Sequence, residues 1–216
     1  MKITWLGHAS FLIESGDKKL ITDPFDEQLG YPVYDEEADI ATVSHGHWDH
    51  SAVDRLKGSP QVVKSAGDFE IDGFKITGFN AYHDQSEGRD RGSNTIYKIF
   101  AEGIALVHLG DLGHIPTAEQ YARMGEVDLL MIPVGGVYTI DAEEAYQIVQ
   151  AIKPGIVIPM HYNTPHLCFE LAPLEQFTCK FNQVVKQPYL EINAENFSQP
   201  MEIIVLDYSR RLTAIE

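Results

Sequence analysis

The stretch His45-Gly46-His47-Trp48-Asp49-His50 decides the fold class of this chain of 216 residues. It contains three imidazoles and one carboxylate, and it directly follows the apolar, strand-like run 39–43. Imidazole and carboxylate together suit a borderline divalent metal such as zinc. Chance would produce this pattern in roughly one chain in a thousand of this composition, so a solvent-exposed, histidine-rich loop is the weaker interpretation.

The spacing within this stretch predicts two metal positions. His45 and His47 are two residues apart, so in an extended segment they project to the same side and can share one ion. Asp49 and His50 lie past the bend that follows and can reach a second ion. The sequence therefore predicts a pair of divalent metal ions, with zinc favoured and manganese or iron as alternatives.

The spacing His-x-His-x-Asp-His resembles the signature of the metallo-β-lactamase superfamily. Three further stretches are similar to the branch of metal-dependent hydrolases that contains the L-ascorbate-6-phosphate lactonases: Trp5-Leu6-Gly7-His8-Ala9-Ser10, Ile21-Thr22-Asp23-Pro24 and Pro159-Met160-His161-Tyr162. The resemblance extends from residue 2 to about residue 206. It implies an α+β fold, the αβ/βα four-layer sandwich, with a dinuclear site at one edge. We expect residues 1–216 to form one such domain.

The resemblance also assigns the remaining metal ligands. His83 takes the place of the third imidazole on the first ion, Asp111 that of the carboxylate shared by both ions, and His161 that of the last imidazole on the second. The complete expected ligand set is His45, His47, Asp49, His50, His83, Asp111 and His161. Among these, Asp49, His50 and Asp111 are the expected catalytic residues.

Four other polar residues are expected near the metal ligands or in the core. His8 is expected near the site without binding metal, and His108 lies in an apolar run that predicts a buried histidine. His114 is either a proton donor on a flanking loop or a surface histidine. Asp23 resembles a carboxylate that orients a ligand histidine, although an Asp-Pro step is also a common turn.

The expected chemistry is hydrolysis of a small substrate. Two ions that share Asp111 can also share a water, and each ion lowers its pKa, so a bridging hydroxide would be available near pH 7. The ions would also stabilise charge that develops on a carbonyl or phosphoryl oxygen. The reaction class is the cleavage of a lactone, ester or phosphodiester.

Arg89 and Arg91 are the candidate contacts to the substrate. They stand in a polar, glycine-containing loop after His83, and the guanidinium group suits phosphate or carboxylate. The alternative is a solvated loop whose arginines pair with the nearby acidic residues at positions 84, 87 and 90.

Composition limits the partners of the chain. The 16 Lys and Arg against 32 Asp and Glu give a net charge of −16, which disfavours binding to a phosphate backbone. No run approaches the roughly 20 apolar residues of a membrane helix, and the N-terminus does not resemble a signal peptide. With only 2 Cys, the sequence predicts a cytoplasmic protein that binds neither nucleic acid nor membrane. Similarity to the lactonases allows a homo-oligomer.

Periodicity predicts short strands in the first half and alternating helices and strands in the second. Asp72-Gly73 and Glu102-Gly103 are typical of hairpin turns. Thr117 with Gln120, and Asp141 with Glu144, predict capping boxes at two helix starts. A further helix is expected over 52–56, directly after the histidine-rich stretch, and another near residue 173.

Two other functions fit a metal-binding sandwich. A catalytically silent, metal-binding regulatory protein would retain the fold without turnover. A di-iron redox protein could use the same fold, but those relatives carry an acidic residue where this chain has His47, and they add a flavin domain that we do not find in this sequence. The complete ligand set favours the hydrolase.

Overall fold

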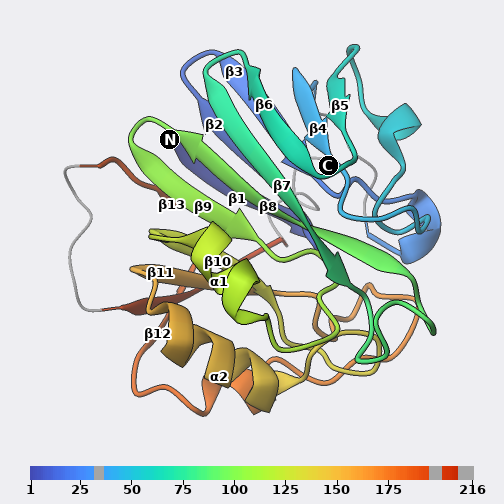
Figure 1. Cartoon of the computed structure of the whole chain (residues 1–216), viewed down its shortest axis with the longest axis vertical. Coiled ribbons are helices and arrows are strands. Elements are labelled where there is room, and N and C mark those ends of the chain that lie inside the picture. Colours follow the sequence, from blue (N-terminus) through green and yellow to red (C-terminus); the bar gives the residue numbers. More distant parts are fainter. Residues whose placement is uncertain (32–36, 195–200, 209–216) are drawn as a thin grey trace.

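The computed structural model describes residues 1–31, 37–194 and 201–208, and two stacked sheets make up most of it (Figure 1). The first sheet has the order β13-β1-β2-β3-β4-β5, with bounds Leu190–Glu191, Lys2–Gly7, Ser10–Ser15, Lys18–Thr22, Ile40–Thr42 and Gln61–Val63. The second has the order β12-β14-β11-β10-β9-β8-β7-β6, with bounds Val184–Gln187, Glu202–Leu206, Ile156–Met160, Leu129–Pro133, Ile104–His108, Ser93–Ala101, Phe74–Tyr82 and Gly67–Ile71.

The main core lies between the two sheets. Successive side chains of a strand point to opposite faces, and in β2 this places Phe11 and Ile13 in the main apolar cluster. Leu12 points the other way, into a smaller cluster on the outer face of the first sheet. Both faces of this sheet are therefore covered, which explains why its strands are apolar on successive residues.

Tight turns join the antiparallel strands where the sequence predicts them. Asp72 and Gly73 join β6 to β7 with φ values of 48° and 85°, and Glu102 and Gly103 join β8 to β9 with 51° and 78°. Two successive residues with positive φ match the right-handed twist of a hairpin. Both predicted hairpins are confirmed.

Three α-helices and two short 3₁₀ turns complete the described elements. The helices are α1 (Ala118–Met124), α2 (Ala142–Ile152) and α3 (Glu175–Thr178), and the turns are η1 (Glu27–Leu29) and η2 (Val53–Arg55). Both predicted capping boxes are present, at the starts of α1 and α2. The helices α1 and α2 lie beside β10 and β12 (Figure 1), and their apolar faces join the main core.

The helix expected over 52–56 is wrong, because only the 3₁₀ turn η2 forms there. The backbone N–H of Ala52 bonds to the carbonyl of Pro24, and Leu56 is already extended at ψ 142°. Gly58 has φ +83° and Pro60 cannot donate a hydrogen bond, so the chain cannot continue as a helix. The outer face of the first sheet is consequently covered by turns and loops, including Phe25 and Leu29.

Several strands end at the same edge of the sandwich. The parallel pairs β3–β4 and β9–β10–β11 bring their carboxyl ends together. The residues that directly follow or closely trail these and neighbouring strands are His8, Asp23, His45, His83, Asp111 and His161. The edge of the sandwich thus gathers residues that lie far apart in the sequence. In the described part of the chain, no helix has both the length and the apolarity needed to cross a membrane.

Candidate metal centre

Asp111 lies at the middle of the histidine cluster and is 2% exposed. Its Oδ1 is 3.3 Å from Nε2 of His50, and its Oδ2 is 3.2 Å from Nε2 of both His83 and His161. Nε2 of His45 is 4.0 Å from the same Oδ2. One buried carboxylate therefore faces imidazoles that come from both sheets.

The histidines form two groups around this carboxylate. In the first group the ligand atoms of His45, His47 and His83 lie within 4.8 Å of one another. In the second group the same holds for His8, His50 and His161. Asp49 reaches the second group, because its Oδ2 is 3.7 Å from Nε2 of His50. All seven expected ligands are thus brought together, with His8 beside them.

Asp23 lies behind this cluster and orients two of its members. Its carboxylate accepts hydrogen bonds from Nδ1 of His50 at 2.9 Å, from the Ser44 backbone N–H at 2.7 Å and from the Ser44 hydroxyl at 2.6 Å. The Ser44 hydroxyl hydrogen is used in this way, so its oxygen accepts from Nδ1 of His45 at 3.0 Å. Asp23 is therefore a supporting carboxylate as well as part of a turn.

These contacts fix where the imidazole lone pairs point. Because His45 and His50 donate through Nδ1, each neutral ring presents the lone pair of Nε2 to the centre. Nε2 of His45 is buried and has no hydrogen-bond partner. A buried acceptor of this kind is costly unless a cation or a donor meets it, so the residues fit a divalent metal ion.

The electrostatics of the cluster favour a positive charge beside Asp111, but not on His45. Burial lowers the pKa of His45 to about 3, which keeps its imidazole neutral and free to bind metal. Burial opposes charge on His50 and Asp111 too. However, the attraction between carboxylates and imidazoles outweighs it, so the pKa of His50 is raised well above its usual value and that of Asp111 is lowered well below. A bound cation would supply the charge that the protonated His50 otherwise provides.

A cavity of about 440 Å³ opens onto this centre. Its lining includes Arg91 and the aromatic side chains of Trp48, Tyr138 and Phe169, together with Asp90. The Arg91 guanidinium lies 5.1 Å from the centroid of the Tyr138 ring, and Tyr138 packs edge-on against Phe169. One wall of the cavity is therefore aromatic and carries a cation.

The two candidate arginines have different surroundings. Arg91 lines the cavity, whereas Arg89 does not and donates its Nε–H to the carbonyl of Ser86. Asp84 does not pair with either guanidinium. Its carboxylate instead accepts four backbone N–H groups, from Ser86, Gly88, Asp90 and Arg91. Burial opposes the charge of Asp84, but these bonds prevail and lower its pKa to about 2, and they fix the backbone that carries Arg91.

The remaining histidines lie outside the cluster. His108 is fully buried and its Nε2 bonds to the carbonyl of Ala9 at 2.8 Å, as expected for a core histidine. Nε2 of His114 accepts the backbone N–H of Tyr82 at 3.2 Å and does not line the cavity. His114 is therefore a loop residue here.

Sequence reasoning missed the residues that hold the centre from behind. Asn94 accepts the backbone N–H of Asp111 at 3.0 Å and donates to the carbonyl of Leu109 at 2.9 Å. Ser44 links Asp23 to His45. For Ser44 the signal was its place beside the first ligand, but nothing local marks Asn94, which lies 17 residues before its partner.

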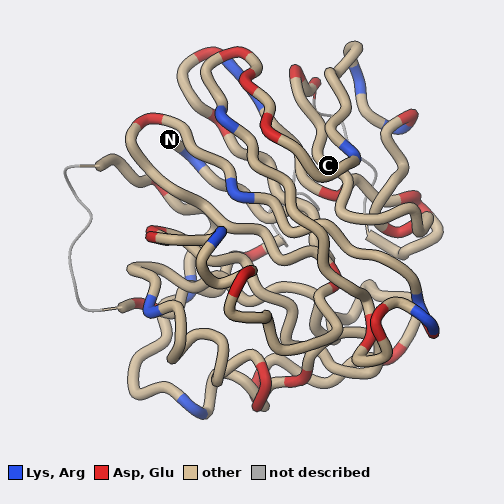
Figure 2. The backbone as a smooth tube through the Cα atoms, in the orientation of Figure 1, with Lys and Arg blue, Asp and Glu red and all other residues tan. Residues whose placement is uncertain are grey.

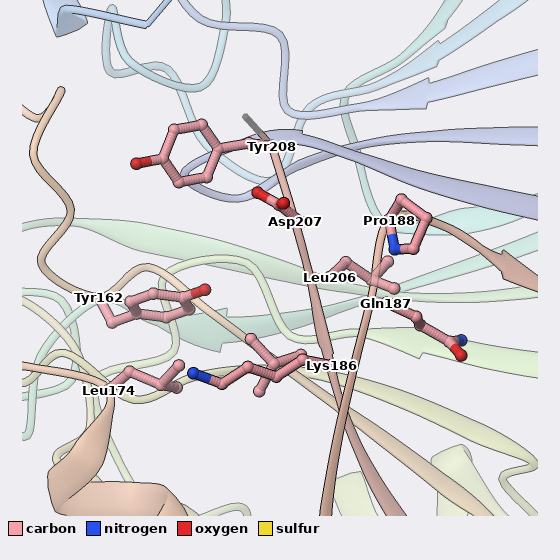
Figure 3. A pocket seen from close by; sticks show the side chains of 9 residues that line it. Tyr162, Leu174, Lys186, Gln187, Pro188, Leu206, Asp207 and Tyr208 are labelled. Atoms are coloured by element: carbon pink, nitrogen blue, oxygen red, sulfur yellow. The ribbon is translucent and has the colours of Figure 1, made fainter. Parts of the chain in front are cut away.

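A second cavity of about 470 Å³ lies beyond Tyr162, the residue after His161, and Figure 3 shows the side chains that line it. Lys186, Asp207 and Tyr208 are among them, and none of the histidine groups lines it. Among the described residues, the histidine groups that could hold a metal ion lie at the cavity of about 440 Å³, so we place the candidate site there.

The fold and the grouped ligands define the class of metal-binding αβ/βα sandwiches. The family model described as a beta-lactamase superfamily domain matches residues 2–161, and the chain belongs to this superfamily. A metal-dependent hydrolase from Pelotomaculum thermopropionicum is 33% identical, with 86% of this chain and 92% of that protein covered. One from Methanosarcina mazei is also 33% identical, with 76% and 84% covered.

Solved structures extend this likeness. A Thermotoga maritima crystal structure from the metallo-beta-lactamase superfamily superimposes with a TM-score of 0.81 and 35% identity, covering 95% of this chain and 99% of that one. The predicted α+β sandwich is confirmed by this match and by the two sheets.

Proposed function

We propose that the chain is a dinuclear, metal-dependent hydrolase that cleaves a small, anionic lactone, ester or phosphodiester. The observation that carries the proposal is the shared position of Asp111 between two groups of imidazoles. Relatives at 33% identity are named metal-dependent hydrolases, and the Thermotoga maritima protein is named as a candidate Zn-dependent hydrolase. These names support a hydrolase and favour zinc.

Seven side chains would hold the two ions. His45, His47 and His83 would bind the first, Asp49, His50 and His161 the second, and Asp111 both. When bound, the ions supply Lewis acidity and a nucleophilic water near neutral pH. The protein contributes neutral imidazoles, of which His45 and His50 are aimed by Ser44 and Asp23, as well as the buried carboxylate between them.

Arg91 is the proposed contact to the anionic part of the substrate. It faces the same cavity as Asp111 and His161, and within the described ranges no carboxylate lies within 4 Å of its guanidinium. Tyr138 and Phe169 continue the wall beside it, which favours an anion attached to an apolar or planar body. Arg89 is turned away and has no part in this proposal.

A small molecule suits this cavity better than nucleic acid. In the described part of the backbone Lys and Arg are interspersed with Asp and Glu (Figure 2), and the net charge of −16 opposes binding to a phosphate backbone. The resemblance of three sequence stretches to the branch that contains the L-ascorbate-6-phosphate lactonases makes lactones the first substrates to try.

The proposal is tested by metal analysis followed by an activity screen. Purified protein should contain two zinc or manganese ions per chain and should hydrolyse at least one of the lactones, sugar phosphates, cyclic nucleotides or generic phosphodiesters. His47→Ala should lose bound metal and turnover together. Full metal occupancy with normal activity in His47→Ala would overturn the ligand assignment. Metal without any hydrolysis would favour the silent regulatory protein, and iron with redox activity the di-iron protein.

A further inference from the structure

His8 directly follows β1 and is buried in the centre, at 1% exposure. Its Nε2 lies 3.1 Å from Nε2 of His50 and 3.4 Å from Oδ2 of Asp49. Its ring centroid is 4.1 Å from that of His161. His8 therefore contacts each of the three residues that the second ion would not share with the first.

The contact between His8 and His50 needs a hydrogen or a cation. The Nδ1–H of His50 donates to Asp23, so when His50 is neutral, as a metal ligand must be, the lone pair of its Nε2 points toward His8. If His8 donated to that lone pair, His50 could not bind metal. The other acceptor, Oδ2 of Asp49, is 3.4 Å away, longer than the ~2.7–2.9 Å of a good hydrogen bond between a nitrogen donor and a carboxylate.

We propose that Nε2 of His8 is a direct ligand of the second metal ion, alongside Asp49, His50, Asp111 and His161. The inference rests on the proposed dinuclear centre. Nitrogen ligands about 2.0–2.1 Å from one ion lie about 3.0–3.4 Å from each other, and the observed 3.1 Å between the two Nε2 atoms falls in this range.

The backbone around His8 is built to hold the ring in this place. His8 has φ +54°, in the left-handed region that is costly for residues other than glycine. Its carbonyl accepts hydrogen bonds from the Trp5 indole at 3.0 Å and from the backbone N–H of His161 at 3.2 Å. Gly7, at φ +114°, packs so closely on Tyr31 that an added Cβ would lie 2.5 Å from the ring.

The two metal positions would then differ in their protein ligands. The first position offers three imidazoles and the shared carboxylate, which is a complete tetrahedral set for zinc. With His8, the second position offers three imidazoles and two carboxylates. This larger set suits an ion that accepts five or six ligands, such as Mn²⁺ or Fe²⁺. The inference therefore predicts that the two positions can be loaded selectively.

Metal binding tests the assignment without reference to turnover. Wild type, His8→Gln and His8→Gly are loaded with Co²⁺, dialysed, and compared by metal analysis, by competition with a chelator and by the visible spectrum of bound Co²⁺. We expect two ions in wild type. In both variants we expect one ion to be retained and the other to bind at least ~100-fold more weakly, beyond the usual ~10–100-fold effect of a residue behind the ligands.

Glutamine and glycine separate the two possible roles of His8. Glutamine can still donate a hydrogen bond to Asp49, so wild-type affinity and spectrum in His8→Gln would overturn the proposal in favour of a positioning role. Glycine accepts the left-handed backbone and leaves space for free imidazole. Added imidazole should restore the second ion and its spectrum in His8→Gly, and failure to do so in a folded variant would also overturn the proposal.

Controls distinguish a failure of the dinuclear function from a failure of the assignment of His8 as a ligand. His166→Gln changes a half-buried histidine outside the centre and should bind two ions as wild type does. Thermal unfolding of the metal-free variants checks that each one folds. If wild type itself binds fewer than two ions, the dinuclear function fails and takes this inference with it. If wild type binds two and the His8 variants bind them equally well, only the inference fails.

Discussion

The stretch 45–50, which follows β4 of the first sheet, and the second sheet position their ligands by different means. The first sheet carries His45 and His50 within one short stretch, and each Nδ1 has a side-chain partner, Ser44 or Asp23. The second sheet carries His83 and His161, and the Nδ1 atoms of both, like that of His8 after β1, are buried without a hydrogen-bond partner. Hydrogen bonds between side chains therefore orient the imidazoles of His45 and His50, the first half of the centre, whereas those of His83 and His161, the second half, must be held in another way.

Close backbone contact with glycine takes that role in the second half. A Cβ added at Gly113 would lie 2.3 Å from the carbonyl carbon of His83, and one added at Gly135 would lie 2.1 Å from the carbonyl oxygen of His161. In the first half, a Cβ added at Gly46 would meet nothing within 4 Å. A site can thus be made rigid by side-chain polarity on one side and by close packing of the main chain on the other.

The largest effect is expected where the two halves meet. Asp111→Ala removes the carboxylate that faces imidazoles from both sheets, so both ions should weaken together. We expect turnover to fall by at least ~10³-fold, the scale on which losing one group that stabilises the transition state is felt. Metal analysis and steady-state kinetics measure the result. An Asp111→Ala protein that keeps one ion at wild-type affinity would show that this metal position does not depend on Asp111.

Removing the support of the first half should weaken both ions. Asp23→Ala deprives His50, a proposed ligand of the second ion, and Ser44, which positions His45 at the first, of their acceptor, and we expect the affinity for each ion to fall by about 10–100-fold. Ser44→Ala should have a smaller effect, since Asp23 keeps its bond to His50. Competition with a chelator measures both affinities. Unchanged affinity in Asp23→Ala would contradict the difference drawn between the two sheets.

The main chain around His83 and His161 should be sensitive to a methyl group added at the neighbouring glycines. Gly113→Ala and Gly135→Ala each force main-chain atoms apart, and we expect the free energy of unfolding to fall by about 1–3 kcal/mol. Gly46→Ala is the matched control from the first half, with an expected change within ~0.5 kcal/mol. Urea unfolding of the metal-free proteins gives the three values. Equal losses of unfolding free energy in Gly46→Ala and Gly113→Ala would show that close packing of glycine does not distinguish the two halves.

A smaller effect is expected at the cavity wall, on the second-sheet side. Arg91→Ala removes the cation that faces the cavity, so KM for an anionic substrate should rise about 10-fold, as for a lost hydrogen bond to a charged group. Arg89→Ala should leave KM unchanged, because its side chain bonds to the Ser86 carbonyl. An unchanged KM in Arg91→Ala would place the substrate's anion elsewhere.

The smallest effect concerns acid stability in the loop after His83. The pKa of Asp84 is lowered to about 2 by four backbone N–H groups that outweigh its burial, against ~3.9 in an unfolded chain. The stability that this carboxylate contributes is therefore present above pH ~4 and is lost as pH falls through about 2. Unfolding curves at pH 4 and pH 2 should differ less in Asp84→Asn than in wild type. Identical pH dependence would show that the loop unfolds independently of Asp84.

The contrast between the sheets also explains what the sequence could predict. Histidine spacing in 45–50 is local and predicts two metal positions without any knowledge of the fold. His83, Asp111 and His161 stand alone in the sequence, so only the resemblance to a family assigned them. The hairpins and capping boxes were also predictable, because their signals lie within four residues.

Long-range contacts account for what the sequence did not reveal. Asn94, Gly113 and Gly135 act on residues from distant strands, and their own neighbours give no sign of this. The helix expected over 52–56 failed for a related reason. Its apolar spacing was real, but Ala52 is tied to Pro24 on a neighbouring segment, and this contact leaves room only for a short turn.

The left-handed backbone at His8, Asp23 and His161, with φ values of 54°, 38° and 52°, has an evolutionary consequence. Such conformations cost about 1–3 kcal/mol each and persist only where the surroundings enforce them. A population selected for thermal stability alone should therefore accumulate glycine or asparagine at positions 8, 23 and 161, and a population selected for function should not. Deep mutational scanning under the two selections would reveal the site by the positions at which stability and fitness disagree.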